Sequence, residues 1–154
     1  MITIPSLPDI ELEATGGHSI NLLKTDGKAV VLYFYPRDNT PGCTLEAQQF
    51  RDLHQEFVKV GAVIFGVSRD SLASHEKFKA KYSLPFELVA DKDSALCNAC
   101  GVIKQKTMYG KKVLGIERST FVADATANVR REWRALKADG HAAEVLEFVR
   151  TLCY

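Results

Sequence analysis

The sequence lacks the features that would place it in a membrane, on a polyanion or outside the cell. It has no apolar run long enough to cross a bilayer. It has no excess of one charge, because 20 lysines and arginines are balanced by 19 acidic residues. Neither nucleic acid nor a membrane is therefore an expected partner. The first residues, MITIPSLPDIELE, have no basic start followed by an apolar stretch, so we expect no secretory signal and a cytoplasmic location.

Cysteine is scarce as well, with four residues in 154. Thiols are held reduced in the cytoplasm, so these cysteines are expected to be catalytic, metal-binding or inert before they are expected to form structural disulfides. No haem, flavin or metal motif accompanies them, and we predict no cofactor and no metal.

The apolar patterns that are present predict one α/β domain over residues 1–154. Two short strands flank Gly16-Gly17. Further strands are predicted at 28–36, 62–68, 86–91, 112–124 and 128–136, and helices at 41–60, 71–84, 93–100 and 140–153. This order predicts a central mixed β-sheet flanked by helices, preceded by an N-terminal β-hairpin.

One cysteine stands where a helix begins, in the segment NTPGCTLEAQQF. Thr40 suits the N-cap position, and Pro41 suits the first helical position, so Cys43 falls in the first turn. Unpaired backbone N–H groups and the positive end of the helix dipole meet there and stabilise a thiolate. Gly42 weakens the helix, a cost that a site admitting another molecule would tolerate. The competing interpretation is an ordinary capped helix with a small buried cysteine.

The segment YPRDNTPGCTLEAQQFRD resembles the active-site loop of the peroxiredoxins, most closely the PrxQ class, also called bacterioferritin comigratory proteins. The family pattern Pro-x-x-x-Thr/Ser-x-x-Cys is matched by Pro36, Thr40 and Cys43. A second segment, GIERSTFVAD, is similar to the family strand that carries an active-site arginine, here Arg118. The C-terminal segment WRALKADGHAAEVLEFV is similar too, so the resemblance covers nearly the whole chain.

The resemblance implies a thioredoxin-like fold and a thiol peroxidase that reduces hydrogen peroxide and organic hydroperoxides. It implies that Cys43 attacks the peroxide and becomes a sulfenic acid. It further implies that Thr40 and the Cys43 backbone N–H bind the peroxide oxygens, that Arg118 stabilises the developing charge, that Pro36 shields the sulfur, and that Glu46 orients the arginine. Taken singly, each could instead be an ordinary cap, strand end or surface charge.

The sequence departs from the family at the thiol that resolves the sulfenic acid. Many PrxQ members carry it five residues after the first cysteine, where this chain has Gln48, and no cysteine occurs in the next predicted helix. Cys100 or, less favoured, Cys97 from the segment CNAC could resolve Cys43 after the first turn of its helix unwinds. Core packing is the competing role for these two thiols. Cys153 is interpreted as a packing cysteine, although it could pair between subunits, and an external thiol is the remaining alternative.

Two other functions stay open at this stage. A redox sensor would show stoichiometric oxidation without catalytic peroxide loss, and a thiol–disulfide oxidoreductase using Cys97 and Cys100 would survive replacement of Cys43. For the peroxidase we expect thioredoxin or another thiol as reductant and a monomer or weak homodimer. All four histidines are predicted to lie on the surface. The Arg37-Asp38 pair is predicted to be solvated, although it flanks the site and could shape its entrance.

Overall fold

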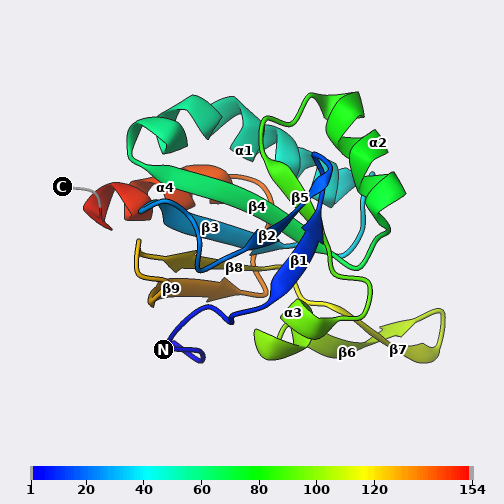
Figure 1. The fold of residues 1–154 in the computed structure, drawn as a ribbon. Helices are drawn as coiled ribbons and strands as arrows, with labels where there is room; N and C mark the ends of the chain where they lie inside the picture. Colours follow the sequence, from blue (N-terminus) through cyan, green and yellow to red (C-terminus); the bar gives the residue numbers. More distant parts are fainter. Residues whose placement is uncertain (1, 153–154) are drawn as a thin grey trace.

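The computed structural model describes residues 2–152, which are built around a seven-stranded mixed sheet (Figure 1). The strand order is β2-β1-β5-β4-β3-β8-β9. The strands of this sheet are β1 (Glu11–Ala14), β2 (His18–Asn21), β3 (Ala29–Phe34), β4 (Ala62–Ser68), β5 (Glu87–Ala90), β8 (Ser119–Ala123) and β9 (Val129–Arg134). The three central strands β5, β4 and β3 are parallel, and antiparallel pairs extend the sheet at both edges. The predicted mixed sheet with an N-terminal hairpin is confirmed.

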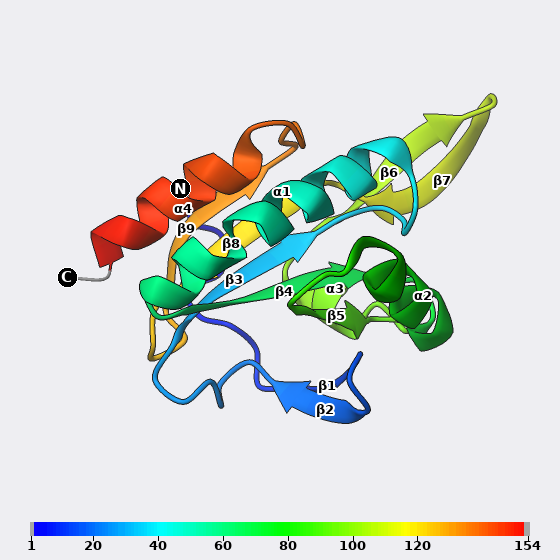
Figure 2. The same ribbon diagram turned by 90° about the horizontal axis from the view of Figure 1, so that it is seen from above.

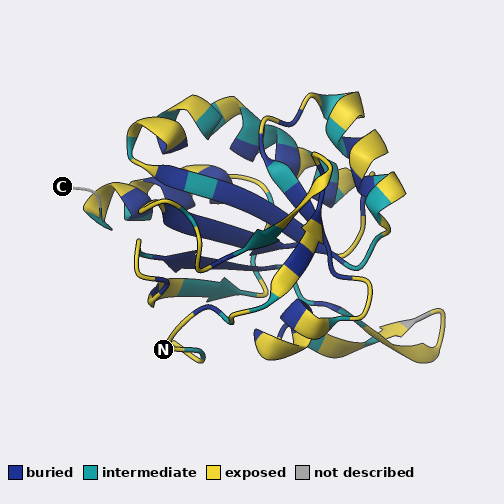
Figure 3. Ribbon diagram, viewed as in Figure 1, coloured by how far each residue is buried: buried dark blue, intermediate teal, exposed yellow. Residues whose placement is uncertain are grey.

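Strand β3 shows how the sequence separates two hydrophobic cores. Every residue from Ala29 to Phe34 is buried, because successive side chains point to opposite faces and both faces are covered. Leu32 and Phe34 belong to one core, whereas Val31 and Tyr33 belong to the other. Figure 3 shows this continuous burial along the central strands. The sheet backbone therefore lies between two separate sets of side chains.

The helices are distributed unequally over the two faces. Helices α1 (Pro41–Lys59), α2 (Leu72–Tyr82) and α4 (His141–Leu152) supply residues to the core that contains Tyr33. Viewed from above, α1 and α4 lie side by side over the sheet (Figure 2). The short helix α3 (Ala95–Ala99) packs on the opposite face. Within residues 2–152, no helix has both the length and the apolar character needed to span a bilayer.

A two-stranded hairpin outside the main sheet differs from the prediction. Strands β6 (Ile103–Met108) and β7 (Lys111–Ile116) pair only with each other and project from the body of the molecule (Figures 1 and 2). The single strand predicted over 112–124 was wrong, because the chain leaves β7 at Glu117 and starts β8 at Ser119. The Glu117 N–H donates to the Val102 carbonyl at 2.8 Å, which directs the chain away from the hairpin. The remaining predicted helices and strands are confirmed within two residues at each end.

Candidate active site

Cys43 lies in the first turn of α1, at the carboxyl end of strand β3. Its side chain is only 2% exposed. Thr40 is the N-cap residue, with φ −96° and ψ 155°, and Pro41 begins the helix, as the sequence predicts. The first helical hydrogen bond runs from the Thr44 N–H to the Thr40 carbonyl at 2.8 Å.

The Thr40 hydroxyl does not cap the helix. It donates instead to the Arg37 carbonyl at 2.9 Å. Among residues 2–152, no protein group accepts from the N–H groups of Gly42 and Cys43, which precede the first helical bond. These two donors and the lone pairs of the Thr40 oxygen therefore remain available for a small oxygen-containing ligand beside the sulfur.

Arg118 brings a positive charge to the sulfur from the other side of the site. Strand β8 pairs with β3 so that Ser119 is the partner of Phe34, and this register carries the preceding Arg118 to the α1 entrance. Nη2 of Arg118 donates to Cys43 Sγ at 3.4 Å, and Nη1 donates to Glu46 Oε1 at 2.6 Å. One guanidinium thus contacts both the thiol and a carboxylate one turn further along α1.

Burial governs the electrostatics of this group. Glu46 is completely buried, and burial raises its pKa to about 7, although Arg118 partly opposes the shift. Burial lowers the pKa of Arg118, but the neighbouring Glu46 and Cys43 outweigh it and raise the pKa above its ordinary value. Arg118 therefore stays protonated and is available as a fixed cation.

Gly42 lies beside the guanidinium of Arg118. A Cβ atom on Gly42 would be 3.2 Å from Arg118 Nη2, so the absence of a side chain lets the guanidinium approach the first turn. Pro36 follows β3 and is exposed.

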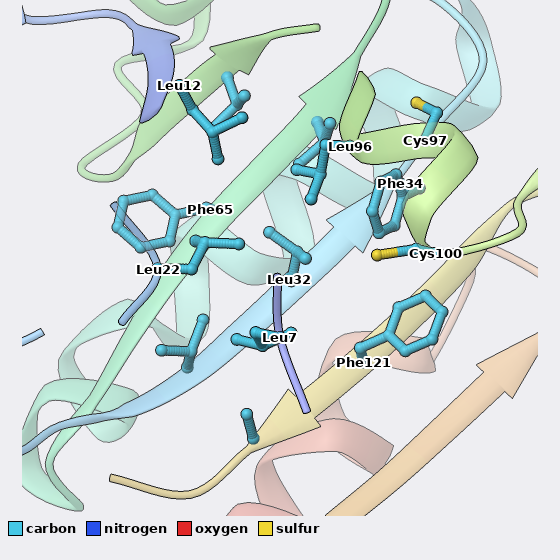
Figure 4. Close-up of a cluster of buried hydrophobic side chains, with 14 of the residues drawn as sticks. Leu7, Leu12, Leu22, Leu32, Phe34, Phe65, Leu96, Cys97, Cys100 and Phe121 are labelled. Atoms are coloured by element: carbon cyan, nitrogen blue, oxygen red, sulfur yellow. The ribbon is translucent and has the colours of Figure 1, made fainter. Parts of the chain in front are cut away.

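Cys97 and Cys100 are not brought near Cys43. Both thiols are fully buried in the core on the α3 face of the sheet, whereas Cys43 belongs to the core on the α1 face. Figure 4 shows Cys97 and Cys100 among Phe34, Leu96 and Phe121. Burial raises the pKa of both thiols, that of Cys100 to about 12. Each is a free thiol with the environment of a core residue. Cys153 lies outside the described residues.

The prediction that every histidine lies on the surface was wrong for two of them. His75 is completely buried and His141 is 2% exposed. Asp38, predicted to be solvated, is 8% exposed and contacts His75 beneath the loop that precedes Cys43. The sequence carried only a weak signal for this contact, because Asp38 and His75 lie in different elements and each follows polar neighbours.

Comparison with known proteins agrees with this geometry. Residues 5–132 match the model of the AhpC/TSA family. The chain therefore belongs to the AhpC/TSA family. The resemblance to the PrxQ class is also confirmed, because the relatives at high identity are peroxiredoxins of that class.

Two of those relatives are the peroxiredoxin Bcp of Bacillus subtilis and that of Xanthomonas campestris. The first is 47% identical over 145 residues, covering 94% of this chain and 92% of the relative. The second is 52% identical over 138 residues, covering 90% and 86%. A solved structure of the Xanthomonas campestris bacterioferritin comigratory protein, studied for alkyl peroxide reduction, superposes with a TM-score of 0.92 at 47% identity, covering 98% of this chain and 99% of that chain. The fold is accordingly the thioredoxin-like fold of peroxiredoxins, and the protein is a thiol peroxidase.

Proposed function

We propose that Cys43 is the nucleophile that reduces hydrogen peroxide and small organic hydroperoxides. The thiolate attacks the terminal oxygen of the hydroperoxide, so an S–O bond forms and the O–O bond breaks. The departing alkoxide or hydroxide takes a proton from water, giving an alcohol or water, and Cys43 is left as a sulfenic acid. The sulfur is oxidised by two electrons and the peroxide is reduced by two.

The observation that carries this proposal is the contact between Arg118 Nη2 and Cys43 Sγ at 3.4 Å. A fixed cation beside the sulfur stabilises the thiolate, and it also lies close to the oxygens between which the bond breaks. The free N–H groups of Gly42 and Cys43 can donate to those oxygens. Thr40, whose own proton is directed to Arg37, can accept a hydrogen bond from the hydroperoxide proton.

Glu46 and Pro36 act through the other residues in this proposal. Glu46 holds Arg118 by the 2.6 Å bond to Nη1, which leaves Nη2 free to face the sulfur. Pro36 covers the outer side of the site and limits water at the sulfur. Neither side chain contacts the reacting atoms, so we assign both positioning roles.

We further propose that an external thiol reduces the sulfenic acid, because the two thiols of CNAC lie across the sheet from Cys43. The thiol sulfur bonds to Cys43 and water leaves, and a second thiol then releases Cys43 and carries away the disulfide. A dithiol protein such as a thioredoxin, in a reducing cytoplasm, supplies both sulfurs. An internal disulfide to Cys100 or Cys97 would require the first turn of α1 to unwind and the sheet edge to open.

Mass spectrometry of protein treated with one equivalent of peroxide tests this proposal. We expect one added oxygen on the Cys43 peptide, dimedone labelling of that peptide, and full recovery of the thiol with dithiothreitol. The Cys43→Ser variant should consume no peroxide, and Cys97→Ser should behave as the wild type. A disulfide between Cys43 and either thiol of CNAC would contradict external reduction while leaving the peroxidase assignment intact.

A further inference from the structure

The loop that leads from β3 to Cys43 carries a buried acidic side chain, that of Asp38. Asp38 accepts hydrogen bonds from Tyr35 Oη at 2.6 Å and Ser74 Oγ at 2.8 Å, and its Oδ2 lies 2.7 Å from His75 Nδ1. The side chains of Asp38 and His75 are 3% and 0% exposed. Ser74 and His75 belong to α2, so the Asp38 side chain connects the loop to this helix.

The partners of His75 determine where its protons are. Nε2 lies 2.8 Å from the Val89 carbonyl, which can only accept, so Nε2 carries a proton. Nδ1 lies 2.7 Å from the Asp38 carboxyl group, which also accepts from two hydroxyl groups. Both ring nitrogens of His75 are therefore engaged, and Asp38, Asp70 and His75 lie together as a hydrogen-bond network.

The same loop is held at two further points. The Asp38 N–H donates at 2.8 Å to Oδ2 of Asp70, two residues after the end of β4. Asn39 Oδ1 accepts from Lys81 Nζ and from Tyr82 Oη, both at 3.2 Å and both on α2. Thr40 and the first turn of α1 follow immediately, so their position depends on this attachment.

Reduction of the Cys43 sulfenic acid by an external thiol requires the loop to move. Cys43 is 2% exposed, so the sulfur of a protein thiol cannot reach it unless the loop and the first turn move outward. We propose that Asp38 and His75 are positioning residues that hold the loop closed, and that this bond speeds oxidation of Cys43 by peroxide and slows reduction of its sulfenic acid by an external thiol. This inference rests on the proposed function of Cys43.

Rates of the two half-reactions in matched variants test the inference. His75→Asn removes the buried bond between the imidazole and Asp38, Ser74→Ala removes one hydroxyl donor to the same carboxyl group, and His18→Asn replaces an exposed histidine as control. In His75→Asn, loss of this buried bond should make oxidation by hydrogen peroxide about tenfold slower and reduction of the sulfenic acid by dithiothreitol severalfold faster. Ser74→Ala should change both rates in the same directions by about twofold. In both variants, amide hydrogen exchange should become faster at residues 38–45 but not in β3.

The opposite signs separate this role from a structural one. The inference is overturned if both half-reactions become slower, or if the rate of reduction is unchanged in both variants. In either case, peroxide turnover by the wild-type protein still supports the proposed function. If His75→Asn does not fold, the two rates and the exchange of Ser74→Ala decide the matter alone. Wild-type protein whose Cys43 is not oxidised overturns the proposed function and this inference with it.

Discussion

Arg118 lies 75 residues beyond Cys43 in the chain, yet its Nη2 atom is 3.4 Å from Sγ. The contact depends on the pairing of β8 with β3, which sets the start of one strand beside the end of the other. The guanidinium is held on its other side by Glu46, so its orientation is fixed before any peroxide arrives. Preorganised charge of this kind lowers the barrier most when it requires no rearrangement during the reaction.

Arg118→Lys tests whether the planar guanidinium matters beyond its charge. An ammonium group cannot donate to Glu46 and to the sulfur in the fixed geometry of a guanidinium. We expect the second-order rate of Cys43 oxidation to fall by about 10²–10³-fold, the usual cost of removing one preorganised donor. Stopped-flow measurement of peroxide consumption gives this rate. Arg130→Lys, at a half-exposed arginine on β9, is the matched control and should leave the rate unchanged. A rate in Arg118→Lys close to that of the control would contradict the role.

Glu46 should make the stability of the protein fall as the pH rises. Burial raises the pKa of Glu46 from 4.5 to about 7, so between these values the folded state binds more protons than the unfolded state. This group alone should remove up to about 3 kcal/mol of unfolding free energy between pH 4.5 and pH 7.

Urea unfolding of the wild type and of Glu46→Gln at several pH values isolates that contribution. Glutamine stays neutral, so the difference in unfolding free energy between the two proteins should shift in favour of the variant as the pH rises. His141 has an opposite effect, because burial lowers its pKa, but it is present in both proteins and cancels in the difference. A difference that is constant from pH 4.5 to pH 7.5 would show that the pKa of Glu46 is the same in the folded and unfolded states.

Cys100→Ala distinguishes a core thiol from a resolving thiol. We expect unchanged oxidation of Cys43 and unchanged turnover with dithiothreitol or thioredoxin, because Cys100 lies on the opposite face of the sheet. Stability should fall by about 0.5–3 kcal/mol, since a buried side chain is shortened in a close-packed core. Steady-state peroxide consumption and urea unfolding measure the two effects. Loss of turnover with thioredoxin while the first oxidation persists would assign Cys100 to the catalytic cycle.

Elements with a buried face could be predicted from the sequence, and the exposed hairpin could not. The run AVVLYF predicts β3 because all of its side chains are apolar and buried. In β6, by contrast, the residues IKQKTM are mostly polar, so no apolar periodicity marks this strand. Its partner β7 is largely exposed and was predicted only as the beginning of the longer strand over 112–124.

The site shows the same division. Cys43 and Thr40 are three residues apart in the sequence, and the start of α1 fixes their relative position. Arg118 and Glu46 were predicted from the resemblance to the peroxiredoxins, because no local sequence pattern indicates that strand pairing will bring them together. The contact between Asp38 and His75 was missed because burial of a polar side chain depends on partners supplied by other elements.

Gly42→Ala should raise stability and lower activity in the same protein. Alanine is favoured over glycine in a helix by about 0.5–1 kcal/mol, and Gly42 does not have the positive φ that would make alanine strained. Its Cβ would be 3.2 Å from Arg118 Nη2, so the guanidinium must move by a few tenths of an ångström away from the first turn. Because catalysis is sensitive to such displacement, we expect Cys43 oxidation to slow by roughly tenfold while the urea midpoint rises. Ala47→Gly, one turn further along α1, serves as the inverse control and should lower stability. A Gly42→Ala protein that is stabilised and reacts with peroxide at the wild-type rate would show that the close approach of Arg118 to the first turn is not needed for the reaction.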